Sequence, residues 1–190
     1  MKKSILTLFT VLLLACSASA APSAKELKAM GTFLSNFTEI GFFDLNVADM
    51  AVEDKIRFGI WHNYINNFKS RIKNCDSCQY GSLRIDASSV AESLKRYMDL
   101  NFTEHQSVEQ SDPPCHFDGK SYHFEGADGE AVYYAKVQKV DYSQGIYTAT
   151  GFFYNADNES DVLGSFEALF KDHLWKGKKT YALISLKSVE

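Results

Sequence analysis

The order of two hydrophobic patterns along the chain is the feature that most constrains its fold. Segments with apolar residues at helical spacing come first, and segments rich in aromatic and β-branched residues follow them. Segregated helices and strands are typical of an α+β fold, whereas an α/β fold alternates them. The sequence therefore predicts N-terminal helices packed on a C-terminal antiparallel meander of four to five strands.

Three segments have the spacing of amphipathic helices. The first, 23–37, starts with Ser23 and has Glu26 three residues later, which matches a capping box. The second, 52–72, carries its apolar residues on one stripe and is the strongest helical pattern in the chain. The third is opened by Asp86 and should end near Asn101, with a second capping box at Ser89–Glu92.

Turn signals divide the second half of the chain into short strands. The predicted strands are 122–124, 131–140, 146–154, 164–170 and 180–186. Short connections make consecutive strands antiparallel neighbours, which predicts a meander. The preceding segment, about 102–120, is polar and contains two prolines, so we expect an exposed, partly extended crossover there.

The first twenty residues have the pattern of an export signal. Lys2 and Lys3 precede an apolar run at 5–15, which is too short to span a membrane, and small residues follow it. Cleavage before Ala21 would release a soluble periplasmic or secreted chain. Cleavage before Cys16, at a sequence resembling the bacterial lipobox, would instead leave a lipid-anchored protein. Both sites remain open, and Cys16 is the candidate for lipidation.

The remaining segment, 21–190, has the length of one domain, with a helical half at about 23–101 and a sheet half at about 121–190. Removing Lys2 and Lys3 changes the balance from 20 basic and 24 acidic residues to 18 and 24, a net charge of −6. This acidity argues against a nucleic-acid partner. Membrane contact is predicted only through a lipid on Cys16.

Three cysteines lie in the domain itself, and an exported chain uses cysteines mainly in disulfides. Cys75 and Cys78 could pair with each other, or one of them could pair with Cys115. A bridge to Cys115 would close a loop of about 38 residues, which in the chain-entropy model constrains the unfolded chain by about 3 to 4 kcal/mol. The sequence does not determine the pairing.

Two other chemistries compete for the same cysteines. A redox site of the thioredoxin type places Cys-x-x-Cys at the start of a helix, whereas this motif follows a predicted helix. A zinc site would use Cys75 and Cys78 together with Cys115, His116 or His123, although an oxidising compartment opposes it. A structural disulfide is therefore the preferred interpretation.

Helices followed by a curved antiparallel sheet resemble the cone-shaped domains of the nuclear-transport-factor-2-like type. The resemblance implies a small-molecule pocket in the concave face of the sheet, lined by residues such as Tyr133, Phe152 and Phe166. That family places a hairpin between its helices, and here only the segment 80–85 could supply a strand at that point.

No hydrolase, zinc-protease or phosphate-loop motif occurs in the sequence. We therefore predict no catalytic residue, no cofactor and no resident metal. The preferred hypothesis is a non-enzymatic, exported module that binds another protein or has a structural role. One alternative is a domain that binds a small apolar ligand in an aromatic pocket, and another is a thiol- or zinc-dependent enzyme. An exposed apolar patch would favour the first and a well-formed cavity the second.

Overall fold

The computed structural model describes residues 21–111, 113–126 and 132–189. Within them lie three α-helices and a short 3-10 helix: α1 (Ala24–Thr38), α2 (Val52–Arg71), α3 (Ala87–Met98) and η1 (Val47–Asp49). The helices precede two antiparallel sheets, so the predicted α+β class is confirmed. None of the described helices is long and apolar enough to cross a membrane. The signal segment and Cys16 lie outside the described residues.

The larger sheet contains the predicted meander. Its strands are β1 (Leu45–Asn46), β6 (Tyr133–Ser143), β7 (Ile146–Asn155), β8 (Asn158–Trp175) and β9 (Lys178–Val189), in the order β1-β9-β8-β7-β6. Two connections are two-residue turns, Gln144–Gly145 and Lys176–Gly177, with positive φ at both residues, as hairpins with type I′ turns require. Local turn chemistry thus sets the β6–β7 and β8–β9 hairpins.

The smaller sheet corrects two predictions. It contains β2 (Ile72–Asn74), β3 (Leu83–Asp86), β4 (Cys115–Phe117) and β5 (Ser121–Phe124), in the order β2-β3-β5-β4. The predicted strand at 122–124 therefore belongs to a second sheet and not to the meander. The predicted crossover also supplies a strand, β4, because β5 offers it an antiparallel partner across a short turn. Between α2 and α3, β3 pairs with β2 to form a hairpin.

The helix ends agree with the sequence in one case and differ in another. The capping box of Ser23 and Glu26 is present at the start of α1. The predicted box at Ser89–Glu92 is wrong, since α3 already begins at Ala87 and Glu92 instead pairs with Arg71 and Lys176. α3 also ends earlier than predicted, because Asp99 adopts the left-handed conformation with φ of 56°.

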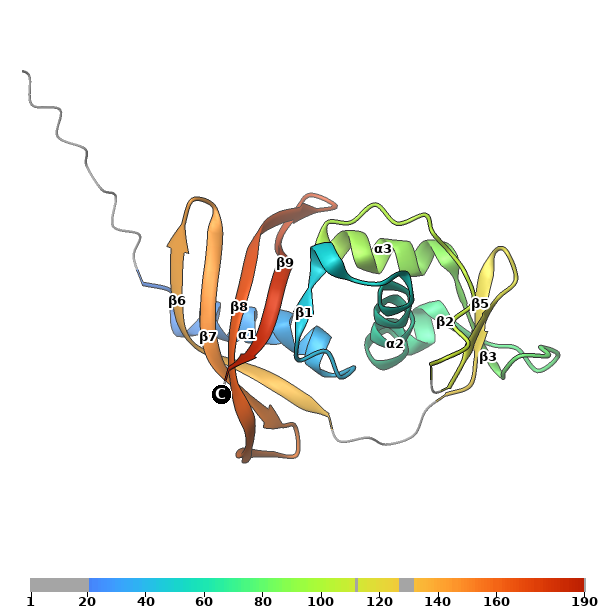
Figure 1. The fold of residues 1–190 in the computed structure, drawn as a ribbon, viewed down its shortest axis with the longest axis horizontal. Helices are drawn as coiled ribbons and strands as arrows, with labels where there is room; N and C mark the ends of the chain where they lie inside the picture. The colour runs from blue at the N-terminus through green and yellow to red at the C-terminus, as the bar shows by residue number, and fades with distance from the viewer. Residues whose placement is uncertain (1–20, 112, 127–131, 190) are drawn as a thin grey trace, which may run out of the picture.

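The helices connect the two sheets. Figure 1 shows the sheets at opposite ends of the molecule, with α2 and α3 between them and α1 across the larger sheet. Phe37 of α1 is fully buried, stacks on Phe58 of α2 at 4.9 Å between ring centroids, and meets Tyr97 of α3 edge-on at 6.3 Å. All three helices therefore share one aromatic cluster.

Candidate functional site

A close approach between α1 and the edge strand β6 creates the first candidate site. A Cβ on Gly31 would lie 2.7 Å from the carbonyl oxygen of Ala135, so only glycine allows this separation. The Ser35 hydroxyl accepts a hydrogen bond from the Ala135 N–H at 3.0 Å, and Thr38 donates one to the Tyr133 carbonyl at 2.6 Å. Side chains of α1 thus satisfy backbone groups that an edge strand otherwise exposes.

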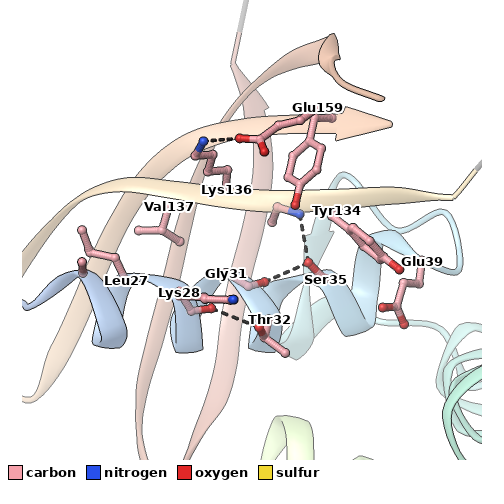
Figure 2. Close-up of a pocket in the computed structure, with 13 residues that line it drawn as sticks. Leu27, Lys28, Gly31, Thr32, Ser35, Glu39, Tyr134, Lys136, Val137 and Glu159 are labelled. Atoms are coloured by element: carbon pink, nitrogen blue, oxygen red, sulfur yellow. Dashed lines mark hydrogen bonds and ion pairs between the residues drawn. The ribbon is translucent and has the colours of Figure 1, made fainter. Parts of the chain in front are cut away.

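A cleft of about 680 Å³ follows this contact (Figure 2). One wall is the face of α1 from Ala24 to Glu39, and the other is β6 from Tyr134 to Val137. Tyr154 of β7 and Glu159 of β8 complete it. The cleft therefore combines helix residues with residues from three neighbouring strands.

The cleft has an aromatic and aliphatic lining with charged groups placed along it. Tyr134 and Tyr154 pack edge to face at 5.9 Å, and Lys136 forms an ion pair with Glu159. Burial raises the pKa of Glu39, whose carboxylate accepts a hydrogen bond from Asn66 at 2.9 Å.

Lys28 is the remaining cation of the lining, and no ion pair joins it to any residue that the structure describes. Glu39, the C-cap of α1, follows Lys28 by eleven positions. At 1.5 Å rise per residue, the two positions lie about 16 Å apart along the helix. Each end of the cleft therefore carries one charge, of opposite sign, outside the ion pair of Lys136 and Glu159.

The three residues named for an aromatic pocket do not line this cleft. Phe166 is in the core and stacks on Phe153, and Tyr133 packs against Phe43. The ring centroid of Phe152 lies 5.7 Å from the ammonium nitrogen of Lys136. The cleft depends on how α1 docks beside β6, which the periodicity of neither segment indicates.

A second candidate site surrounds a disulfide between Cys75 and Cys78, in the turn between β2 and β3. The Cys78 Sγ lies 2.8 Å from Nδ1 of His123 on β5. The Nε2 of the same ring lies 2.8 Å from Oδ2 of Asp118. A cysteine, a histidine and an aspartate thus form a continuous chain of contacts.

Two backbone features place these groups. Gly81 has φ of +129°, and a Cβ there would lie 2.4 Å from the backbone of Phe124, so glycine lets the turn approach β5 closely. Asp118 Oδ1 accepts hydrogen bonds from the N–H groups of Lys120 and Ser121, at 2.8 and 2.7 Å. The His123 contact, followed by these backbone bonds, holds the pKa of Asp118 well below its usual range.

Of the pairings that the sequence left open, the structure contains Cys75–Cys78 and not a bridge to Cys115. Cys115 is 1% exposed and free. Burial raises the pKa of the Cys115 thiol to about 11, which makes it a poor nucleophile.

His123 is the one candidate partner for Cys75 and Cys78 that the structure brings to them, with the three side-chain atoms within 4.8 Å of one another. The disulfide removes the two thiolates that zinc would need, so the oxidised cluster is not a metal site. Sequence reasoning missed Asp118, whose only signal is its place in the tight turn before the strand that carries His123.

No family model, no curated protein and no solved structure matches this chain. The resemblance to the nuclear-transport-factor-2-like type therefore stays a prediction, and functional inference depends on the two sites themselves.

Proposed function

We propose that this protein is an exported binding module that holds a short peptide segment in the cleft between α1 and β6. The observation that carries the proposal is the cleft itself, whose volume of about 680 Å³ is within the range of ligand sites in proteins. The export signal in residues 1–20 supports a location in the periplasm, in the envelope or outside the cell.

The distribution of charge favours a peptide with free ends over a wholly apolar ligand. Lys28 offers a cation for a carboxylate at one end, and Glu39 offers an acceptor for an amino group at the other. An extended peptide covers about 3.3 Å per residue, so four to five residues would span the roughly 16 Å between them.

The lining between these charges suits apolar side chains. Leu27 and Val137 provide aliphatic surface, and the paired rings of Tyr134 and Tyr154 provide flat surface with polar tips. Because Lys136 is already paired with Glu159, it adds no uncompensated charge to the middle of the cleft. A peptide of small and aliphatic residues is therefore the expected ligand.

The proposal is tested by calorimetric titration with the pentapeptide Ala-Leu-Ala-Leu-Ala carrying free ends. We expect C-terminal amidation and the Lys28→Ala substitution each to weaken binding by about fivefold, since an exposed ion pair contributes up to about 1 kcal/mol. The two changes together should weaken binding no more than either alone, because both remove the same ion pair between Lys28 and the peptide carboxylate.

Lys25→Ala is the matched control, because Lys25 is an exposed lysine of α1 that does not line the cleft. It should leave the affinity for the pentapeptide unchanged. No measurable heat at millimolar peptide, or an equal loss of affinity in both lysine variants, would contradict a peptide site in the cleft.

A further inference from the structure

The Cys75–Cys78 disulfide contributes little as a staple. The paired cysteines are three positions apart, so the bond closes a very short loop and constrains the unfolded chain far less than a long one. The hairpin is also closed without it, because the Cys75 N–H donates to the Ser82 carbonyl at 2.8 Å and β2 pairs with β3.

The groups beside the disulfide are those that activate a thiol. Asp118 accepts a hydrogen bond from Nε2–H of His123, so the neutral imidazole directs the Nδ1 lone pair at Cys78 Sγ. A disulfide sulfur has no proton to give that lone pair. Once the bond opens, the same geometry allows the Cys78 sulfur and His123 to exist as a thiolate and an imidazolium, which the Asp118 carboxylate stabilises.

We infer that the Cys75–Cys78 bond is a redox-active disulfide that oxidises a dithiol, with Cys78 as the leaving sulfur and His123 as the proton acceptor. Asp118 is a positioning residue that acts through His123. This inference does not depend on the proposed peptide cleft, which lies on α1 and β6.

The reaction balances with a dithiol as the only co-reactant. The first substrate sulfur attacks Cys75 Sγ while its proton passes to Nδ1 of His123, and the Cys75–Cys78 bond breaks with its electron pair on Cys78 Sγ. The second substrate sulfur then attacks the first in the mixed disulfide and releases Cys75 as a thiolate, which takes the second proton. Two electrons pass to the protein, and the substrate leaves as a disulfide.

Exposure separates this pair from the third cysteine. Cys75 and Cys78 are half-buried in a turn whose neighbours Asp76, Ser77 and Gln79 are exposed, so a substrate sulfur can reach them. Cys115 is buried, and burial raises the pKa of its thiol. Exchange is thus confined to the pair beside His123.

The test is a redox titration of the full exported chain in glutathione buffers at pH 7, followed by alkylation and mass spectrometry. The tryptic peptide 74–84 contains Cys75 and Cys78 but not Cys115, so it reports the pair alone. We expect His123→Ala to make the disulfide at least tenfold harder to reduce at equilibrium, a shift of about 30 mV for a two-electron couple. Asp118→Asn should shift the equilibrium about threefold in the same direction.

His116→Ala is the matched control, because His116 lies opposite His123 on β4 but stacks on Tyr80 and is not part of the cluster of Cys75, Cys78 and His123. It should leave the equilibrium within twofold of the unsubstituted protein. Circular dichroism identifies any variant that does not fold. If His123→Ala does not fold, Asp118→Asn still tests the inference, because it preserves the shape of the side chain.

Three results would overturn the inference. One is an unchanged equilibrium in both the His123 and Asp118 variants. Another is a disulfide that resists glutathione until the protein is denatured. The third is purification of the protein with the two cysteines reduced and protected by bound zinc.

Discussion

The two sheets differ in how far apart along the chain their strands lie. In the larger sheet, β6 to β9 are consecutive, and each pairs with the next across a short turn. In the smaller sheet, β3 pairs with β5, although residues 87–120, which include the whole of α3, separate them. The first sheet follows from local turn chemistry, whereas the second exists only because the helices bring distant segments together.

The two candidate sites follow the same division. The cleft lies beside β6, which belongs to the locally formed sheet, and needs only the docking of α1. The chain of contacts from Cys78 to His123 and Asp118 lies at the smaller sheet and needs the long-range pairing of β3 with β5. Glycine permits a close approach at each site, Gly31 against Ala135 and Gly81 against Phe124.

The largest expected effect comes from the aromatic cluster that joins the halves. Phe37→Ala should lower the free energy of unfolding by about 3 to 5 kcal/mol, because it removes a fully buried ring that contacts both α2 and α3. Urea unfolding followed by circular dichroism and by tryptophan fluorescence measures the loss.

Phe68→Ala is the control for this prediction, since Phe68 is 38% exposed near the end of α2. This substitution should lower the free energy of unfolding much less than Phe37→Ala. Equal losses for the two substitutions would show that the cluster is not what connects the two sheets.

The free energy of unfolding should depend on pH through His62. This residue is 1% exposed, stacks on Phe58 and meets Tyr97 edge-on. Burial, with smaller effects of Arg96 and Arg71, lowers the pKa of His62 to about 3. The unfolded chain, with an ordinary histidine pKa near 6.5, therefore binds the proton first as pH falls. Stability present above pH 6.5 is lost progressively down to pH 3.

At pH 4.5 this loss should amount to about 2 to 3 kcal/mol relative to pH 7.5. His62→Phe keeps a ring between Phe58 and Tyr97 but cannot be protonated, so its stability should fall less over the same interval. Urea unfolding at the two pH values measures both proteins, and parallel losses would exclude His62 as the cause.

The smallest effect is expected where α1 meets β6. Ser35→Ala removes the hydroxyl that accepts a hydrogen bond from the buried Ala135 N–H, and leaving that group unpaired should cost about 1 to 2 kcal/mol. Thr32→Ala is the control, because the exposed Thr32 hydroxyl bonds only to a carbonyl of its own helix. Thermal unfolding should separate the two variants, and an equal shift would mean that the Ser35 bond to Ala135 has no special role.

Prediction from sequence succeeded where one segment contains the whole signal. The capping residues of α1 and the glycine turns between β6 and β9 are read from neighbouring residues, and both are present. It failed where the partner is remote. The box at Ser89–Glu92 has the right residue types, yet Glu92 pairs with Arg71 and Lys176, which the spacing around α3 does not indicate.

The candidate sites show the same limit. The sequence identified Cys75, Cys78 and His123 as chemically relevant, but not that Cys78 and His123 touch or that Asp118 holds the ring. The three residues expected to line a pocket are aromatic strand residues, and the cleft formed elsewhere because α1 lies along the edge of β6.

Hydrophobic period, capping and turn geometry act within a few residues, so the α+β class, the start of α1 and the order of the hairpins β6 to β9 can be predicted from neighbouring residues. The pairing of the cysteines, the position of the cleft and the approach of His123 to Cys78 arise only when the chain folds. Those outcomes depend on packing between segments up to a hundred residues apart, as in the bond between Ser35 and Ala135, and no local pattern encodes such distances.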